Sequence, residues 1–486
     1  MYLKQKFDTF IRIFDDIGYI TNNSDFRDRV VSKSGAVFLS AISREPQTID
    51  ELAYKIHEKF INVDFETVFN DVKEFYKMLE EDGFIVSGNT PEECDKKDTR
   101  FTYKAIEPKT IKKDFSSENK RSENSTQKFL EMHFKDKPKL MYLQIELTSR
   151  CNERCLHCYI PHENKTADIL PELFYNVLEQ CEAIGVLGLT LSGGEPLLHK
   201  DFCDFLKKCK EKDFSVNILS NLTLLNDEII SEMKENRLSS VQVSLYSMKP
   251  EIHDAITQVK GSHKKTTESI LKLIENDIPL HISCPTMKQN KNCFGDVLKW
   301  AKELKVRATT DYIMMAKYDG TTDNLDNRLS LNEVAKVINE IIENDDRYQH
   351  RMKTSDIDKA EKRDFSDDIA CGVCISSICM VANGNVYPCP GWQSFVLGNV
   401  NDTTLKDIWE KSEKVKYLRG IRKKDFPICL TCVDKAFCAM CMVRNANENS
   451  EGDPLKINEH FCKIAKLNRE IVLEWKEKLN IDAESI

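Results

Sequence analysis

The fold of this chain is decided by residues 141–158, MYLQIELTSRCNERCLHC, in which a strand-like run leads directly into three cysteines. The run ends at Thr148, and Cys151, Cys155 and Cys158 follow at C-x3-C-x2-C spacing. In parallel α/β folds, reacting groups lie in the loops at the carboxyl ends of strands. The spacing therefore predicts a reactive loop at one edge of a sheet.

The chemistry of this cysteine trio is that of a metal site. Three thiolates on a four-iron cluster leave one iron without a protein ligand. An open coordination position is what a catalytic metal site needs, by analogy with zinc. Taken alone, the same trio also fits a zinc site or a non-catalytic cluster.

Length, composition and charge set the class of protein. At 486 residues, the chain is expected to form about two to four domains. Its 41% hydrophobic and 31% charged residues are typical of a folded globular protein. The charged start and the lack of any run near the roughly 18 apolar residues of a membrane span predict a cytoplasmic protein with no membrane partner. A net charge of -9 argues against a nucleic-acid partner, because such binding needs Lys and Arg against phosphate.

The 18 cysteines point to metal binding rather than to disulfides, which are disfavoured in the cytoplasm. Three cysteines lie in the trio and nine lie between Cys371 and Cys462. The six scattered ones are expected to be small buried apolar residues: Cys94, Cys181, Cys203, Cys209, Cys284 and Cys293.

Strand and helix patterns alternate over residues 139–320. Alternation of this kind predicts a parallel sheet with helical crossovers. Six units are fewer than the eight of a complete barrel, so we expect an α/β fold with an open, partial (β/α)6 TIM-like barrel. The strand candidates are MYLQIELT (141–148), LGLTLSG (187–193), SVNILSN (215–221), SVQVSLYS (240–247), LHISCPT (280–286) and VRATTDYIM (306–314).

Three helical patterns and a following strand pair predict a winged-helix domain over residues 1–93. The patterns cover GAVFLSAI, a helix opened by a capping box of Thr48 and Glu51, and residues 64–81. The remaining regions are a polar linker (94–138) with a short helix near Lys128–Phe134, a charged bridging region (321–368), a cysteine-rich domain (369–465) and a C-terminal helix (466–486).

A second motif follows the next strand of the barrel. LGLTLSG runs into Ser192-Gly193-Gly194-Glu195-Pro196. Paired glycines let a ligand approach the backbone closely, and the glutamate offers an acceptor for a cationic amine. Alone, GGEP is more often an ordinary turn; one strand after a cysteine trio, it indicates a binding site.

With both motifs, residues 140–315 resemble the radical S-adenosylmethionine (SAM) superfamily. The resemblance implies a [4Fe–4S] cluster on the trio, whose fourth iron binds SAM. Reductive cleavage of SAM then yields a 5′-deoxyadenosyl radical that abstracts a substrate hydrogen. The resemblance also implies that Gly193, Gly194 and Glu195 hold the SAM amine, that His157 lies near the adenine, and that Ser220, Asn221 and Ser244 contact ribose or carboxylate.

The later cysteines follow a second ordered pattern. Two C-x2-C pairs alone fit zinc knuckles. Their order, with Gly384 before Cys389, resembles the SPASM domain, although two residues rather than three separate Cys438 and Cys441. The resemblance implies two auxiliary [4Fe–4S] clusters, three in all: one on Cys371, Cys374, Cys389 and Cys441, the other on Cys429, Cys432, Cys438 and Cys462. Cys379 is left over, in a hairpin that turns at Asn383-Gly384; we expect a buried core thiol, and a ligand role in place of Cys371 or Cys374 is the alternative.

Residues 15–87 resemble a peptide-binding winged helix, the RiPP recognition element. The resemblance implies that residues 1–93 bind the leader of a ribosomally made precursor peptide, which adds a strand to a sheet edge. The alternatives are a DNA-binding winged helix and a module that only supports the barrel. Nine Asp and Glu against four Lys over residues 51–90 oppose DNA binding.

Residues 243–266 and 311–330 resemble peptide-thioether synthases. Such enzymes link a Cys sulfur to a carbon of another residue, and a flavodoxin or ferredoxin is the expected reductant. Carbon–carbon crosslinking, epimerisation and anaerobic sulfatase-type maturation remain alternatives, as does a non-enzymatic iron–sulfur electron-transfer or redox-regulatory protein. Tyr246, Asp311 and Tyr312 are candidates for a general base only because they lie at strand ends.

Overall fold

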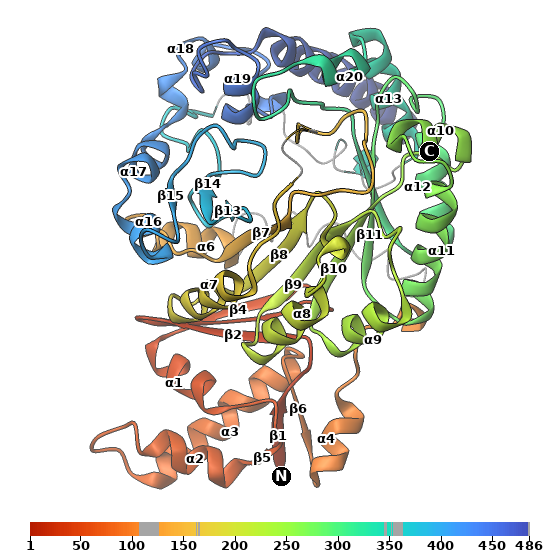
Figure 1. Cartoon of the computed structure of the whole chain (residues 1–486). Coiled ribbons are helices and arrows are strands. Elements are labelled where there is room, and N and C mark those ends of the chain that lie inside the picture. The colour runs from red at the N-terminus through yellow and green to blue at the C-terminus, as the bar shows by residue number, and fades with distance from the viewer. Residues whose placement is uncertain are drawn as a thin grey trace.

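The computed structural model describes residues 1–105, 126–161, 163, 166–344, 348–350, 352 and 363–484. An N-terminal module lies below a central sheet, and the cysteine-rich region lies above and to one side of it (Figure 1). None of the described helices has the length and apolar character that a membrane crossing requires.

The N-terminal module combines two small antiparallel sheets with the four helices α1 to α4. Each sheet has three strands, in the orders β5-β1-β6 and β2-β3-β4. The elements are β1 (Tyr2–Gln5), β2 (Thr9–Phe14), β3 (Ile17–Asn22), β4 (Arg27–Val31), α1 (Lys33–Ala41), β5 (Gln47–Thr48), α2 (Ile49–His57), α3 (Phe65–Glu81), β6 (Ile85–Gly88) and α4 (Pro91–Lys97).

The three predicted helices of this module are confirmed, and their local signals explain them. The Thr48 side chain accepts a hydrogen bond from the Glu51 N–H, and the Glu51 carboxylate accepts one from the Thr48 N–H at 2.8 Å. In α3, Val68, Val72 and Leu79 lie at helical spacing and are buried against the other helices.

The strands of the module differ from the expected pair that follows the helices. After α3, β6 pairs with β1 at the start of the chain, and four strands precede α1. The expected boundary at residue 93 also falls inside α4, where Cys94 is buried and its Sγ lies 3.5 Å from the Tyr2 carbonyl oxygen. The packed module thus extends into α4, and the winged-helix assignment stays a prediction.

The partial barrel is confirmed. Six parallel strands stand side by side in chain order, β7 to β12. They are β7 (Tyr142–Thr148), β8 (Gly188–Gly193), β9 (Ser215–Ser220), β10 (Leu238–Ser244), β11 (Leu280–Pro285) and β12 (Arg307–Asp311), connected by α7 (Pro171–Ala183), α8 (Phe202–Glu211), α9 (Asp227–Glu235), α10 (Pro250–Thr257), α11 (Ser262–Glu275) and α12 (Phe294–Glu303).

The two faces of the barrel strands differ in polarity. In β7, Leu143, Ile145 and Leu147 are buried in the main hydrophobic core, and the alternate residues point to the opposite face. That opposite face is polar and partly open along the sheet, at Gln144, Asn217, Gln242 and Ser283. A closed barrel fills its interior with apolar layers. The described barrel therefore presents a polar face on the side of the sheet opposite the main core.

The sheet continues past the barrel into the cysteine-rich region. The predicted hairpin is confirmed as β13 (Ser377–Met380) and β14 (Asn385–Tyr387), with Gly384 at φ +83° in the turn. Its parallel pairing with β7, and the addition of β15 (Gly398–Asn399), were not expected. An open barrel leaves the edge of β7 unpaired, and β13 covers that edge.

The bridging region contains a helix that the sequence reading missed. α13 (Leu331–Asn344) buries Val334, Val337 and Ile342 and packs on the C-terminal helix α20 (Glu459–Glu484), which begins earlier than expected. Abundant charges on its outer face hide this apolar stripe. The other helices are α6 (Thr126–His133), α16 (Leu405–Lys411), α17 (Glu413–Gly420), α18 (Pro427–Leu430) and α19 (Met442–Asn447); α6 confirms the short helix in the linker.

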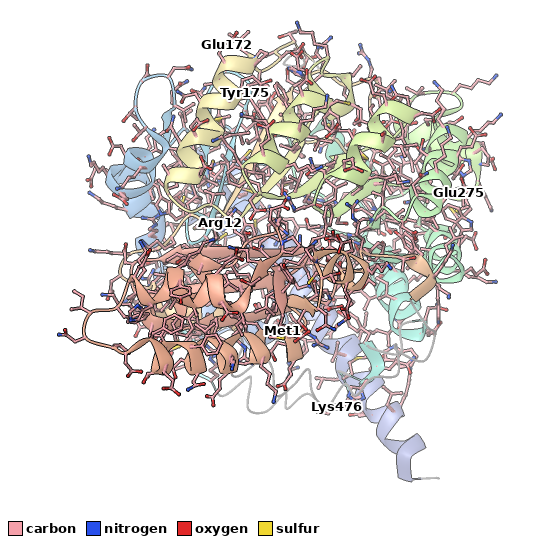
Figure 2. The ribbon with its side chains drawn as sticks, turned by 90° about the horizontal axis from the view of Figure 1, so that it is seen from below. Met1, Arg12, Glu172, Tyr175, Glu275 and Lys476 are labelled. Carbon is pink, nitrogen blue, oxygen red and sulfur yellow. The ribbon has the colours of Figure 1, made fainter. Side chains whose placement is uncertain are left out.

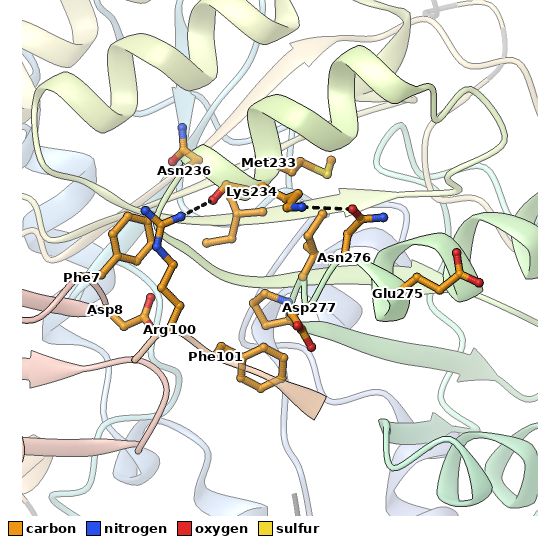
Figure 3. A pocket seen from close by; sticks show the side chains of 13 residues that line it. Phe7, Asp8, Arg100, Phe101, Met233, Lys234, Asn236, Glu275, Asn276 and Asp277 are labelled. Atoms are coloured by element: carbon orange, nitrogen blue, oxygen red, sulfur yellow. Dashed lines mark hydrogen bonds between the residues drawn. The ribbon is translucent and has the colours of Figure 1, made fainter. Parts of the chain in front are cut away.

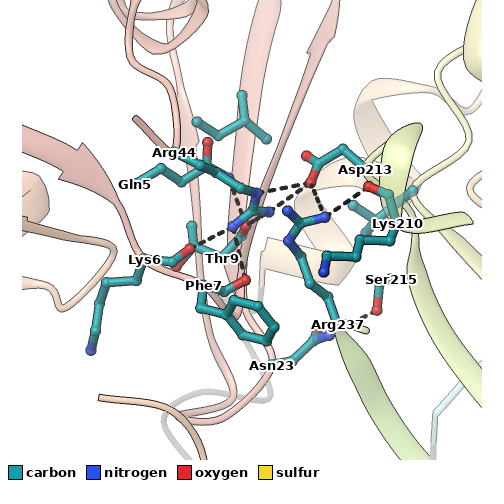
Figure 4. Close-up of polar contacts among 12 residues, drawn as sticks. Gln5, Lys6, Phe7, Thr9, Asn23, Arg44, Lys210, Asp213, Ser215 and Arg237 are labelled. Atoms are coloured by element: carbon teal, nitrogen blue, oxygen red, sulfur yellow. Dashed lines mark hydrogen bonds and ion pairs between the residues drawn. The ribbon is translucent and has the colours of Figure 1, made fainter. Parts of the chain in front are cut away.

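Arginines fasten the N-terminal module to the base of the barrel. The Arg12 guanidinium donates to the carbonyl oxygens of Val186 (2.8 Å) and Asp213 (2.7 Å), and Arg44 donates twice to the Asp213 carboxylate (3.0 and 2.7 Å; Figure 4). Val186 and Asp213 precede β8 and β9. Seen from below, the module spreads across this base with Arg12 at the junction (Figure 2). The module therefore covers the amino-terminal ends of the strands, opposite the cysteine loop.

Candidate active site

The cysteine loop, residues 151–158, has no regular structure and is held by the end of α10. The Arg154 N–H donates to the Thr257 carbonyl oxygen and the Leu156 N–H to the Ile256 carbonyl oxygen, both at 3.0 Å. The loop thus has a defined path without a helix or strand of its own.

The three thiols of the loop are partly buried neighbours. Burial raises the pKa of the Cys155 thiol well above its usual range, and the negative charges of Glu153, Cys158 and Cys151 add to this shift. Among the described residues, no three Cys, His, Asp or Glu side chains converge on the position of a single metal ion. The site is a set of neighbouring thiols, and its donor chemistry fits an iron–sulfur cluster.

The GGEP turn lies directly against the cysteine loop. The Gly194 N–H donates to the Thr148 carbonyl oxygen at 2.7 Å, and the Glu195 N–H donates to the Arg150 carbonyl oxygen at 2.8 Å. A Cβ on Gly193, which has φ +143°, would overlap the Thr148 carbonyl oxygen, and one on Gly194 would overlap that of Arg150. In this structure the glycines permit a close approach to the backbone of residues 148–150, just before the cysteine loop, and their contact with the SAM amine stays a prediction.

Glu195 is fully buried and holds the turn together. Its carboxylate accepts hydrogen bonds from the Ser220 hydroxyl (2.7 Å), the Asn221 N–H (2.8 Å) and the Leu197 N–H (3.0 Å). Burial raises its pKa to about 7, although these bonds act in the opposite direction. Glu195 thus joins the ends of β8 and β9, and its contact with the SAM amine stays a prediction.

The other predicted SAM contacts lie at the same edge of the sheet. The Asn221 side chain donates to that of Asn152 in the cysteine loop at 2.9 Å. At the end of β10, the Ser244 side chain lies near the Tyr246 phenol, where burial raises the pKa of Tyr246 and Ser244 acts in the opposite direction. The Tyr246 ring meets that of His157 edge-on, with 5.1 Å between centroids. The fold therefore brings together the cysteine loop, the GGEP turn and the ends of β9 and β10.

The first predicted group of auxiliary cysteines is assembled by the fold. Burial raises the pKa of the Cys389 thiol to about 11, and the neighbouring Cys441 and Cys371 thiolates raise it further. Cys374 lies close to Cys371 and Cys389, and its pKa rises to about 12, chiefly through burial. These four cysteines, which we call the first thiol group, come from three separate loops.

The second thiol group consists of Cys429, Cys432, Cys438 and Cys462. Burial raises the pKa of Cys438 to about 11, and the other three thiolates contribute to that rise. α20 supplies the last of the four, so this group ties the C-terminal helix to the loops before α19.

Cys379 belongs to neither group. It is fully buried on β13, and burial, then the charges of Glu146 and Cys389, raise its pKa well above the usual range. This placement agrees with the expected buried thiol.

A buried carboxyl at the junction of barrel and cysteine-rich region was missed. Glu146 of β7 is 3% exposed, and its Oε1 accepts a hydrogen bond from the Gln393 side chain at 3.0 Å. Burial raises its pKa to about 7, against hydrogen bonds from Gln393 and Tyr159. Tyr159 adjoins Cys158, so this junction lies between the trio and the first thiol group. The signal in the sequence is a charged residue inside the otherwise strand-like QIEL.

The three candidates for a general base lie in different parts of the molecule. Tyr246 contacts the cysteine loop. Tyr312 points to α20, where its hydroxyl donates to Asn468 at 2.9 Å, and Asp311 accepts the Ile313 N–H at 2.8 Å. The last two contacts are structural.

A cavity of about 240 Å³ lies elsewhere, between the N-terminal module and the barrel (Figure 3). Arg100 lies across the Phe7 ring at 4.0 Å and donates to the Lys234 carbonyl oxygen. The barrel residues of its wall, including Asn236 and Asp277, precede β10 and β11. The cavity is a seam at the base of the barrel and not part of the cysteine site.

Two stretches of the chain match family models. Residues 145–301 match the radical SAM superfamily, and residues 371–433 match SPASM, an iron–sulfur cluster-binding domain. The chain therefore contains a radical SAM domain and an SPASM domain. The first stretch spans the trio and the GGEP turn, and the second spans the first three cysteines of the first thiol group.

Curated relatives resemble the radical SAM protein over most of its length. It is 25% identical over 370 residues to the tungsten-containing aldehyde ferredoxin oxidoreductase cofactor-modifying protein of Pyrococcus furiosus, which covers 69% of this chain and 97% of the relative. It is 24% identical over 330 residues to the antilisterial bacteriocin subtilosin biosynthesis protein AlbA of Bacillus subtilis, which covers 64% of this chain and 69% of that one.

Solved structures share its fold. Streptococcus suis SuiB bound to precursor peptide SuiA superposes with a TM-score of 0.60 at 15% identity and covers 94% of this chain and 99% of that one. SuiB has also been solved bound to S-adenosylmethionine. anSMEcpe with bound AdoMet and the Cp18Cys peptide gives a TM-score of 0.53 at 17% identity and covers 70% of this chain and 99% of that one. The radical SAM protein thus shares the SuiB fold from the N-terminal module to the SPASM domain.

Proposed function

We propose that this radical SAM protein is an enzyme that modifies a ribosomally made precursor peptide by forming Cys thioether crosslinks. The observation that supports this most is the architecture. An N-terminal module is fastened to a radical SAM barrel, and the sheet of the barrel continues into the cysteine-rich region that contains the two thiol groups. The likeness to SuiB, which has been solved bound to its precursor peptide SuiA, extends over 94% of the chain.

In this proposal, Cys151, Cys155 and Cys158 hold a [4Fe–4S] cluster, and SAM binds at the neighbouring strand ends. When bound, cluster and SAM supply the 5′-deoxyadenosyl radical that abstracts a substrate hydrogen. The GGEP turn holds the cysteine loop by backbone hydrogen bonds, and Glu195 fixes that turn to β9. Preorganising the site in this way limits the rearrangement needed when the ligands bind.

The two thiol groups would hold two further [4Fe–4S] clusters, giving three in the chain. Each group contains four thiols from separate segments of the chain, so binding of a cluster by each group would also stabilise the fold. We place the protein in the cytoplasm, where its cysteines stay reduced and able to bind iron, with flavodoxin or ferredoxin as reductant.

For the leader peptide, we propose the edge of β4. Among the described strands, β4 pairs with β3 alone, so its other edge is open to an added strand. The end of α3 lies beside it: Arg29 of β4 forms an ion pair with Asp82 at 2.6 Å and donates to the Met78 sulfur. A strand added here would lie against α3, as a winged-helix leader-binding domain requires.

Other peptide chemistries use nearly the same parts. Carbon–carbon crosslinking and epimerisation differ in what happens to the substrate radical. Sulfatase-type maturation differs in the N-terminal module, since anSMEcpe covers 70% of this chain against 94% for SuiB. A non-enzymatic electron-transfer role would leave SAM uncleaved.

The test uses protein reconstituted anaerobically with iron and sulfide, then incubated with dithionite, SAM and candidate peptides encoded beside its gene. Formation of 5′-deoxyadenosine, loss of two hydrogen atoms from the peptide and loss of one alkylatable thiol are expected together. A variant with Ala at all three cysteines of the trio is the control. Peptide modification without loss of a thiol would reject thioether formation, and absence of 5′-deoxyadenosine would reject the enzyme.

A further inference from the structure

Tyr246 is held rigidly between the barrel and the cysteine loop. Its N–H donates to the His253 ring at 3.3 Å, and its carbonyl oxygen accepts a hydrogen bond from the Asn290 side chain at 2.8 Å. Its side chain is 3% exposed and packs with Ile256, Met287 and Met314. The ring therefore has one well-defined position.

That position delivers a single hydroxyl group to the cysteine loop. The Tyr246 hydroxyl lies 3.7 Å from Cys155 Sγ and 3.5 Å from His157 Nε2. The Tyr246 hydroxyl is thus within hydrogen-bond distance of a cysteine of the trio. The loop itself supplies backbone donors, but this donor comes from a different strand.

The direction of the hydrogen bonds follows from their chemistry. The phenol proton has two acceptors within reach, Cys155 Sγ and His157 Nε2. A sulfur that ligates iron does so as a thiolate. Charged acceptors form stronger hydrogen bonds than neutral ones, so the proton is directed at Cys155. The neighbouring Ser244 side chain favours the polarised phenol and so strengthens its bond to sulfur.

We propose that Tyr246 is a positioning residue that donates a hydrogen bond to the Cys155 sulfur and so raises the reduction potential of the cluster on the trio. Reduction adds an electron to the cluster, and a donor at a ligand sulfur stabilises the more negative state. The proposal rests on the radical SAM assignment and goes beyond it, because it names a tuning device outside the loop.

A packing role is the competing explanation, and the two make different predictions. If Tyr246 only fills space beside Met287 and Ile256, a phenylalanine would serve equally well. If the hydroxyl acts on the sulfur, its removal changes the cluster without changing the packing.

The experiment is a potentiometric titration of the reconstituted full chain, followed by electron paramagnetic resonance. The signal of the cluster on the trio is the one that changes when SAM is added. In Tyr246→Phe we expect a more negative midpoint for this signal, with unchanged iron content and several-fold slower SAM cleavage by dithionite. Ser244→Ala is expected to give a smaller shift of the same sign. Tyr312→Phe is the matched control, since it loses one phenol hydrogen bond, to Asn468 on α20.

An unchanged midpoint in Tyr246→Phe would overturn the proposal, as would an equal shift in Tyr312→Phe. If Tyr246→Phe does not retain the cluster, the Ser244→Ala variant is the deciding measurement. A more negative midpoint potential in Ser244→Ala supports the proposal, and an unchanged midpoint rejects it. A wild-type protein without any SAM-sensitive signal would instead reject the radical SAM assignment, so the two failures are distinguishable.

Discussion

At the residue scale, the two glycines of the GGEP turn show how tightly β8 approaches the cysteine loop. Gly194→Ala places a methyl group on the Arg150 carbonyl oxygen, where backbone on both sides prevents relief. We expect the free energy of unfolding to fall by about 1–3 kcal/mol, as in other overpacked sites, and iron retention at the trio to fall with it. Gly420→Ala is the control, since no atom lies within 4 Å of its added Cβ. Equal denaturation midpoints for the two variants would contradict this account.

Glu146 gives a pH dependence at the same scale. Its pKa of about 7 in the folded protein exceeds the ordinary 4.5, so the folded state holds the proton more tightly than the unfolded state does. This residue therefore destabilises the fold progressively as pH rises from about 4.5 to 7, by about 3 kcal/mol in all. Glu146→Gln keeps an acceptor for Gln393 and removes the charge. Urea titrations across this range should show a flatter pH profile for Glu146→Gln than for the wild type; parallel profiles would refute the shift.

At the element scale, the β13–β14 hairpin separates two kinds of cysteine. Cys379 faces Glu146 from β13, whereas Cys389 lies beyond β14 among the first thiol group. We expect Cys389→Ala to lower iron content by up to about four atoms per chain and Cys379→Ala to leave it unchanged. Iron and sulfide analysis of both reconstituted variants measures this. A comparable loss in Cys379→Ala would place that thiol among the ligands.

At the scale of the whole molecule, polar contacts join the module to the barrel, and several of them meet at Asp213. Arg44 bonds the Asp213 carboxylate and the carbonyl oxygens of Lys6 and Phe7. Arg44→Ala is expected to cost about 2 kcal/mol, since charged hydrogen bonds are lost, and to speed amide exchange at residues 213–216. Arg27→Ala is the control, because Arg27 bonds the Asp82 carbonyl oxygen within the module. Identical amide exchange at residues 213–216 in both variants would show that Arg44 does not hold the N-terminal module against the barrel.

The leader-binding proposal is tested at this scale as well. Arg29→Glu removes the ion pair with Asp82 and places a second negative charge at the β4–α3 junction. We expect the enzyme to lose affinity for full precursor peptide by at least tenfold while SAM cleavage without peptide is unchanged. Lys77→Glu, on an exposed part of α3, is the control. If the Arg29→Glu variant modified the full precursor peptide as fast as the wild type, the edge of β4 would be rejected as the leader-binding site.

The sequence by itself determined the six barrel strands, the three helices of the N-terminal module, and the cysteine and glycine motifs. Each of these depends on local periodicity, capping or spacing, which neighbouring residues carry. Only the tertiary structure decided that β13 pairs with β7, that α13 packs on α20 and that β6 pairs with β1. The roles of Glu146 and Tyr246 were decided there too. Such contacts join residues far apart in the chain, so they follow from which edges and apolar faces are left uncovered once the local elements have formed.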